Sequence, residues 1–397
     1  MRRLSLALLM LFVFTVPWQN ATGYVTNALW AAAFVGTIAT GLLERRIARP
    51  PALFLAMLAF VAWQLTTYYW SIDPESSLAR VRLMIFMLVL VWMVTELAAS
   101  ERIRHYLMQA YVLGCFVLCG ILINAFISGH AIDGYRYVPS NFNPNVAADM
   151  IAVGVAMALL ITGSRYGRKL LILNIAFVPL GLFGVILTAS RSGFFLTCLA
   201  AVGVFFVLRH TRLLYRAAWF VVLVGVFAGV FFGLAANQTL GVNLQRLTFQ
   251  TGTYSLGTLT GRTTIWSAGL EHFEEHPLAG VGAGTFNAAV EGQLGGRNSA
   301  HNVFIETAVE TGTVGLILLI VALVASASPV LHWRDHQTGL RMVLLMVVIG
   351  ASLVANISAY YLLWFVLAVL SRTGATNERP VEGLSSAAGD RSHYVQV

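Results

Sequence analysis

The sequence has little charge: Asp, Glu, Lys and Arg make up only 11% of its 397 residues, whereas 58% are hydrophobic. Soluble domains are about 25% charged, so this chain has too little polar surface to cover its apolar mass in water. Intrinsic disorder is excluded as well, because it requires low hydrophobicity. The composition therefore predicts a polytopic membrane protein, and about 20 residues per span allow roughly a dozen spans.

Cysteine and lysine are also scarce. The three cysteines, Cys115, Cys119 and Cys198, lie in apolar runs and form no CxxC pair. Their placement argues against a disulfide framework or thiolate metal site and predicts packing inside the membrane. Lys169 is the single lysine among 25 basic residues. GC-rich codon usage explains such an arginine bias, and so does phosphate recognition, because arginine binds phosphate bidentately.

Apolar runs predict twelve transmembrane helices and hence an all-α polytopic membrane protein. The first follows Met1 and runs to Trp18, and the others cover about 24–43, 51–70, 78–98, 107–128, 143–163, 170–188, 193–208, 217–236, 301–327, 341–355 and 358–371. We expect one transmembrane domain over residues 1–372, interrupted by a long loop at about 237–300, and a short disordered tail at 373–397.

The basic residues divide unevenly between the two sides of this topology. Eighteen of the 25 lie in one set of alternate loops, so the positive-inside rule places that side and both termini in the cytoplasm. The net charge of +8 is then a topology signal and predicts no nucleic-acid partner. Seven arginines oppose the rule and face the outer side: Arg80, Arg82, Arg136, Arg191, Arg246, Arg262 and Arg297.

The long outer loop predicts two short helices joined by a glycine-rich connector, Gly280 to Gly284. The first helix has Thr260 as its N-cap, Arg262 in its first turn and Pro277 at its end; the second covers about 285–292. The run from His272 to His276 matches the zinc signature H-x-x-E-H. Pro277 follows at once and a third ligand is not evident, so we expect no metal.

Two polar segments adjoin the outer ends of predicted spans. His301 begins the tenth span, where a helix N-terminus disfavours the imidazolium; it is interpreted either as a general base or as an interfacial histidine. Arg191 lies in the tight turn before span eight, where Ser190 and Ser192 point to an anion site. Snorkelling of Arg191 to lipid headgroups is the alternative.

Two further arginines are placed by the turn before span four. Asp73 and Pro74 form that turn, Ser77 is the expected N-cap, and Arg80 and Arg82 follow at the mouth of the span. Arg136 lies in another outer loop, which is rich in Tyr and Asn. Its aromatic residues fit an interfacial belt, or stacking on sugar rings.

Several of these segments together resemble the O-antigen ligase and polymerase superfamily of bacterial envelopes. The resemblance rests on five stretches in the family's order: Trp70-Ser71-x-Asp73-Pro74, Thr188-Ala189-Ser190-Arg191-Ser192-Gly193, Gly261-Arg262-x3-Trp266, His276-Pro277-Leu278-x-Gly280-Val281-Gly282, and Ser299-Ala300-His301-Asn302 with Glu306 and Glu310-x-Gly312. Each stretch is loosely defined, but together they are fairly specific to the superfamily and much less so to one member.

The resemblance implies an O-antigen ligase of lipopolysaccharide biosynthesis. Such a protein is a metal-independent, inverting glycosyltransferase with a GT-C-like fold, in the bacterial inner membrane, and it needs no cofactor. It moves a glycan from undecaprenyl diphosphate to a sugar of the lipid A core on the periplasmic side. By this likeness His301 is the base, and Arg191 and Arg262 bind the diphosphate. Electrostatics adds further substrate-binding candidates, together with a motif neighbour of His301: Arg80, Arg82, Arg136, Arg246, Arg297 and Asn302.

Three alternatives stay open. An O-antigen polymerase would join lipid-linked glycans by similar chemistry. A protein O-oligosaccharyltransferase would carry more C-terminal mass outside the membrane. A transporter of lipid-linked glycan predicts broken helices and polar residues in mid-span, whereas Glu96 and Asp149 lie near the expected span ends. The sequence does not indicate an oligomeric state.

Overall fold

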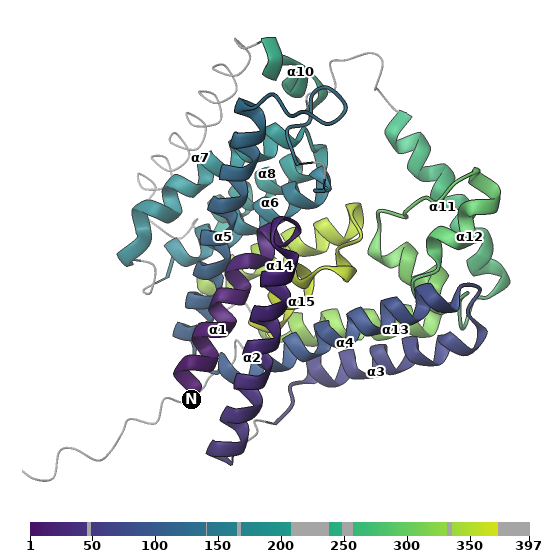
Figure 1. Cartoon of the computed structure of the whole chain (residues 1–397), viewed down its shortest axis with the longest axis horizontal. Helices are drawn as coiled ribbons and strands as arrows, with labels where there is room; N and C mark the ends of the chain where they lie inside the picture. Colours follow the sequence, from purple (N-terminus) through teal and green to yellow (C-terminus); the bar gives the residue numbers. More distant parts are fainter. Residues whose placement is uncertain are drawn as a thin grey trace, which may run out of the picture.

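The computed structural model describes residues 1–45, 49–139, 141–164, 168–207, 238–247, 257–331 and 336–371. This part of the chain is helical and contains one isolated β-bridge, between Ile132 and Arg136. The long helices form a bundle, with the shorter α11 and α12 beside one end of it (Figure 1). The predicted all-α class is therefore confirmed.

The helices follow the predicted spans closely. They are α1 (Arg2–Thr15), α2 (Gly23–Glu44), α3 (Ala52–Thr67), α4 (Pro74–Leu97), α5 (Glu101–Ile127), α6 (Pro144–Thr162), α7 (Leu171–Thr188), α8 (Arg191–Val207), α10 (Gln238–Leu247), α11 (Gly257–Glu275), α12 (Phe286–Leu294), α13 (Val303–Leu331), α14 (His336–Val354) and α15 (Tyr361–Leu370).

Nine helical segments in the described ranges are long and apolar enough to cross a membrane, and α8 and α15 are shorter apolar helices. Together they match eleven of the expected spans and make the chain a multi-pass membrane protein. The span expected at 217–236 and the tail at 373–397 lie outside the described residues, so the count of twelve stays a prediction.

Helix α6 forms the centre of the bundle and is buried along almost its whole length. Small residues let its neighbours approach closely, as is common between membrane helices. Gly193 of α8 packs on Ala148, and Gly154 of α6 packs on Cys115. Cys115 and Cys119 are buried and free, which confirms that these two cysteines pack inside the bundle.

The helix ends fall into two groups. At one end, Arg2 of α1 donates a hydrogen bond to the carbonyl oxygen of Glu96, 3.3 Å away. Close by in sequence, Glu101 of α5 pairs with Arg341 of α14 at 2.8 Å, and Leu370 of α15 lines a pocket with Arg341. The start of α1 and the end of α15 thus share this end, which we call the basic end after Arg2 and Arg341.

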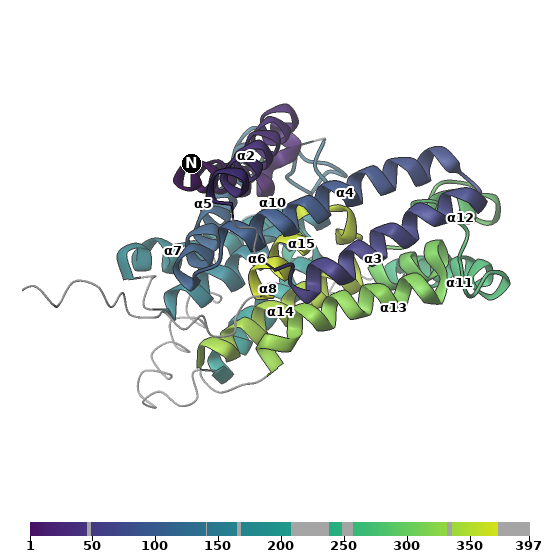
Figure 2. The same ribbon diagram turned by 90° about the horizontal axis from the view of Figure 1, so that it is seen from below.

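The opposite end, called the loop end, carries α11 and α12 beside the turn from α3 to α4. Figure 2 shows α3, α4 and α13 running side by side toward them. The glycine-rich segment connects α11 to α12 as predicted, and its backbone also packs against α13. Val281 donates to the carbonyl oxygen of Val309 at 3.0 Å, and Gly282 to that of Glu310 at 2.8 Å. Gly312 interrupts α13 at this point with a φ of 67°, which glycine adopts without strain.

Three predicted helix starts were wrong, namely those of α4, α11 and α13. Asp73, not Ser77, caps α4: its carboxylate accepts from the Ser76 amide at 3.1 Å, and Pro74 takes the first helical position that proline favours. Helix α11 begins at Gly257, ahead of Thr260. Arg262 therefore lies in the second turn of α11. The low helix propensity of threonine is a small effect, and it did not prevent the helix from extending through Thr260. Helix α10 in the same loop was not predicted.

Candidate active site

The segment Ser299 to Asn302 is fixed from two sides. Trp266 of α11 donates its indole N–H to the carbonyl oxygen of Ala300 at 2.7 Å. The side chain of Asn356, in the turn before α15, donates to Ser299 Oγ at 2.5 Å and accepts from the Asn302 amide at 2.9 Å. Two elements far apart in sequence thus hold the backbone on both sides of His301.

The sequence predicted that His301 lies in the first turn of a membrane helix. In the structure, His301 instead precedes α13, which begins at Val303. Asn302 is the cap, because its side-chain oxygen accepts from the amides of Phe304 and Ile305 at 2.9 and 3.1 Å. His301 has a φ of 48°, in the left-handed region that few residues other than glycine adopt. Strained backbone of this kind concentrates at functional sites, and here it fixes the direction in which the imidazole leaves the chain.

The surroundings of His301 favour its neutral form. The side chain is half-buried, and this burial is the main cause that lowers its pKa below the ordinary value of about 6.5. The positive charge of Arg262 lowers the pKa of His301 further. A neutral imidazole at pH 7 can accept a proton, which a general base requires.

A buried ion-pair network lies behind this segment. Arg80 of α4 contacts Glu306 of α13 at 3.0 Å and Glu310 at 3.8 Å. Asn356 donates to Glu306 at 3.1 Å with the same amide group that reaches Ser299. Buried charges are stable only when paired and hydrogen-bonded, so Arg80 balances two carboxylates while Glu306 orients Asn356.

A second group of polar residues lies where α6 meets the start of α8. Asp149 is fully buried on α6, and one of its oxygens accepts a hydrogen bond from Ser192 Oγ at 3.5 Å. Its other oxygen is buried and has no hydrogen-bond partner among the described residues. The sequence predicted an anion site around Arg191 at the start of α8. In the structure, the carboxylate of Asp149 lies beside this helix start.

Arg262 connects these two groups electrostatically. It is half-buried on α11, and burial lowers the pKa of its guanidinium whereas the charge of Asp149 raises it. The same guanidinium acts on His301. The structure thus brings Arg262 within electrostatic range of both the expected base and the α6–α8 contact that carries Arg191.

The remaining predicted arginines have other surroundings. Arg136 donates to the Thr188 carbonyl at 3.0 Å and to Asn145 Oδ1 at 2.7 Å, so it closes the end of α7, and its burial lowers its pKa. Arg297 is exposed and pairs with Glu291 at 3.2 Å. Arg82 lies on an exposed face of α4. Arg246 lies in α10, and its side chain is outside the described part.

The H-x-x-E-H run lies at the end of α11. His272 contacts Glu275 at 3.5 Å through Nδ1. Within the residues that the structure describes, no three His, Cys, Asp or Glu side chains gather closely enough to hold a metal ion. This run therefore contributes a contact between a histidine and a glutamate to α11.

The geometry brings four further residues to this site. Glu306 and Glu310 had been noted only as part of the motif that follows His301, whereas Asp149 and Asn356 had not been assigned to the site. Glu306 and Glu310 carried a signal, because two acids four residues apart in an apolar span require a partner. The neutral Asn356 carried no signal, since its partners come from two other segments. Asp149 lay close enough to the expected end of a span to be read as interfacial.

Comparison with known proteins relates part of this chain to one family. Residues 175–320 match the family described as O-antigen ligase. The chain is also 29% identical over 304 residues to the exopolysaccharide production protein ExoQ of Rhizobium meliloti (strain 1021). That match covers 71% of this chain and 66% of ExoQ, slightly less than two thirds of the relative's length.

The matched region holds three of the residues predicted from the sequence to carry the chemistry, namely Arg191, Arg262 and His301. It begins after Asp149 and Arg80, which reach the site from helices earlier in the chain. Residues 175–320 thus match the O-antigen ligase family, and this match together with the similarity to ExoQ confirms the resemblance of this chain to the O-antigen ligase and polymerase superfamily.

Proposed function

We propose that this protein is an O-antigen ligase, an inverting glycosyltransferase of the bacterial inner membrane whose site faces the periplasm. It takes a glycan from undecaprenyl diphosphate and passes it to a sugar of the lipid A core. The observation that carries the proposal is the placement of His301, in strained backbone and beside the charge of Arg262. A base next to a cation suits a reaction that deprotonates an acceptor and releases an anion.

The reaction is a single displacement. An acceptor hydroxyl oxygen attacks the anomeric carbon, and its proton passes to the neutral imidazole of His301. The bond from the anomeric carbon to the diphosphate oxygen breaks, and the electron pair leaves with undecaprenyl diphosphate. Because the acceptor approaches opposite the leaving group, the anomeric configuration inverts. This scheme requires no metal.

Arg191 and Arg262 are assigned to the diphosphate. Charge that develops on the leaving oxygen is stabilised by cations already in place, especially where water is excluded. We assign Asp149 to holding Arg262 by charge while no donor is bound, a role that its buried carboxylate and the pKa of Arg262 support. A donor phosphate would then take over this charge pairing.

The acceptor is tested by transfer with purified protein. Labelled glycan on undecaprenyl diphosphate is offered with either lipid A core or a second lipid-linked glycan, and the products are separated by mass. We expect transfer to lipid A core. Longer lipid-linked glycan alone would instead identify a polymerase, an alternative favoured by the name of ExoQ, which refers to exopolysaccharide production. No transfer to either acceptor would contradict both.

Transport is a weaker candidate. The interruption of α13 at Gly312 is a feature that transporters also show. Here the nearby carbonyl oxygens of Val309 and Glu310 accept hydrogen bonds from Val281 and Gly282. The break is thus filled by the protein's own loop, so we assign it to packing.

Replacing Arg262 with lysine is expected to lower kcat/KM roughly 10- to 100-fold, because a bidentate charge-assisted contact is worth about 1.5–3 kcal/mol. Lysine keeps the charge but not the planar fork. The same loss is expected for Arg191→Lys. The matched control is Arg297→Lys, since Arg297 is exposed and pairs with Glu291. If Arg262→Lys and Arg191→Lys are as active as the control Arg297→Lys, the assignment of Arg262 and Arg191 to the diphosphate is contradicted.

A further inference from the structure

The strained backbone of His301 is held through the two peptide groups that flank it. The group before His301 contains the carbonyl oxygen of Ala300, which accepts the indole N–H of Trp266 at 2.7 Å. The group after it contains the N–H of Asn302, which donates to Asn356 Oδ1 at 2.9 Å. The two contacts together constrain φ and ψ of His301, because these torsions relate the two planar peptide groups. A left-handed φ such as that of His301 persists only where the surroundings over-determine it.

The side-chain amide of Asn356 is oriented by three partners. Its Nδ2 group donates to Ser299 Oγ at 2.5 Å and to Glu306 Oε1 at 3.1 Å, while its Oδ1 accepts from Asn302. Rotating the amide by half a turn would set Nδ2 against the N–H of Asn302 and Oδ1 against the carboxylate of Glu306. The position therefore requires two donors and one acceptor on one flat group, which asparagine supplies and aspartate does not.

The turn that carries Asn356 is fixed to two other helices. The side chain of Asn302, at the start of α13, donates to the carbonyl oxygen of Leu353 at 3.2 Å. Arg80 of α4 donates to Ser358 Oγ at 3.4 Å, and Ser358 is buried. Asn356 thus acts from a position that contacts on both sides of it in the chain maintain.

We propose that Asn356 is a positioning residue, which keeps the imidazole of His301 directed at the acceptor hydroxyl. This inference rests on the proposed role of His301 as the base, and it applies to either acceptor. Asn356 touches neither the donor nor the acceptor in this scheme and acts through the backbone of His301. We expect kcat of Asn356→Ala to fall roughly 100-fold, the cost of misplacing a reacting group by about 1 Å. KM for the donor should stay nearly unchanged, because Arg191 and Arg262 remain in place.

A pair of substitutions tests this role while keeping polar groups in place. Asn356→Asp loses both donors and sets a second carboxylate beside Glu306, so kcat should fall as in Asn356→Ala. Adding Glu306→Gln supplies an amide that donates to the new carboxylate, which still accepts from Asn302, and the hydroxyl of Ser299 can donate instead of accept. The double variant should therefore recover most of kcat. The proposal is overturned if kcat of the double variant stays at the level of Asn356→Asp.

The reactivity of His301 reports its placement without any glycan. Diethyl pyrocarbonate modifies neutral imidazole, and mass spectrometry of peptides from the full-length protein follows each histidine separately. The rate at His301 should fall as pH drops through a midpoint below about 6.5, because burial and the charge of Arg262 lower the pKa of His301. In Asn356→Ala the ring leaves this environment, so the midpoint should rise toward about 6.5. An unchanged midpoint would contradict the positioning role. If the unaltered protein transfers no glycan, the proposed function fails, whereas this measurement still tests the placement of His301.

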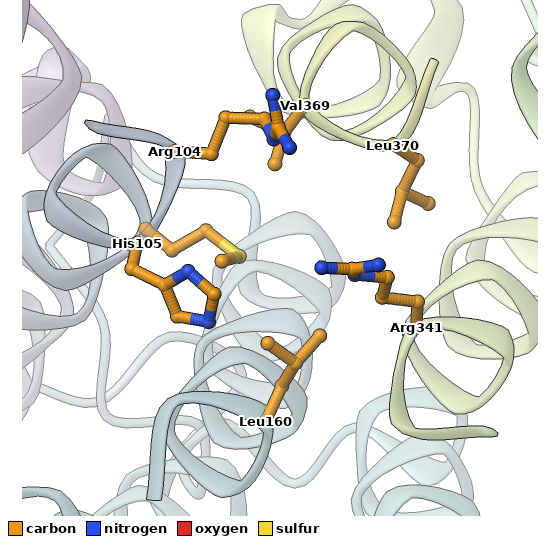
Figure 3. Close-up of a pocket in the computed structure, with 7 residues that line it drawn as sticks. Arg104, His105, Leu160, Arg341, Val369 and Leu370 are labelled. Carbon is orange, nitrogen blue, oxygen red and sulfur yellow. The ribbon is translucent and has the colours of Figure 1, made fainter. Parts of the chain in front are cut away.

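Asn174→Ala is the matched control. Asn174 is a fully buried asparagine of α7 that exchanges two hydrogen bonds with Gln109 of α5, at 2.9 and 3.0 Å. Its loss should lower the Tm and leave kcat and the midpoint of His301 unchanged. His105 is an internal control, because its ring lines a pocket at the opposite, basic end of the bundle (Figure 3) and is only 2% exposed. If Asn356→Ala speeds the modification of His105 as much as that of His301, the variant loosens the whole bundle and the proposal is overturned.

Discussion

Replacing His301 with alanine is expected to lower kcat/KM for glycan transfer by roughly 10²–10⁴-fold, the usual effect of removing a general base. The Tm should change little, because the segment is held through Ser299, Ala300 and Asn302 and not through the imidazole. Initial rates of transfer from a labelled lipid-linked donor, with circular dichroism of each variant, measure both quantities.

Two variants separate chemistry from backbone geometry. His301→Asn keeps a residue that tolerates the left-handed conformation but cannot accept a proton at neutral pH, so it should be as inactive as the alanine variant. His276→Ala removes an exposed histidine of the same loop and should keep full activity. Activity in His301→Asn near the unaltered level would show that His301 serves the backbone alone.

The pH dependence provides a second readout of the same prediction. The base must be neutral, so kcat/KM should fall as pH drops through the pKa of His301. Burial and Arg262 both lower that pKa, which places the loss of activity below pH of about 6.5. In Arg262→Gln one lowering cause is removed, so the acid limb of the residual activity should move to higher pH.

The spans could be predicted from the sequence because the membrane imposes their length and composition. Apolar runs near 20 residues identified eleven helices that the structure describes, with ends usually within a few residues. Helix starts were less certain because several residues compete to cap one helix. Asp73 displaced Ser77 since Pro74 follows it, and α13 starts after His301 because Asn302 has the better capping side chain.

The parts of the site that could be predicted were those contained in one short segment. His301 with Asn302 and Arg191 with Ser192 were each visible as polar residues at a span end. The connection between them was not visible, because Asp149 reaches Ser192 only through the close packing of α6 on α8. Contacts of this kind depend on tertiary packing, which no local pattern encodes.

Arg80 is a second residue whose contacts could not be predicted from the sequence. Its position on the outer side made it a candidate for binding the diphosphate, and charge alone supports that. The structure adds Glu306 at 3.0 Å and Glu310 at 3.8 Å. A cation that already balances two buried carboxylates has a structural task, and a substitution can separate this task from substrate binding.

Replacing Arg80 with leucine is expected to destabilise the protein by about 3–5 kcal/mol, because breaking a buried ion pair leaves uncompensated charge. Glu306 and Glu310 are only 5% and 3% exposed, so water can do little to replace the guanidinium. Thermal unfolding in detergent measures the loss as a lower Tm. Arg82→Leu, two residues away on an exposed face of α4, should leave the Tm nearly unchanged.

A triple variant, Arg80→Leu with Glu306→Gln and Glu310→Gln, determines which role dominates. Removing all three charges should recover most of the Tm, since neutral replacement of buried charge networks often costs little. In Glu306→Gln the side-chain amide oxygen would still accept the hydrogen bond from Asn356, so His301 should stay in place and transfer should recover with the Tm. If the Tm recovers and transfer does not, the charge of Arg80 acts on the donor, and the diphosphate site extends from Arg191 and Arg262 to α4.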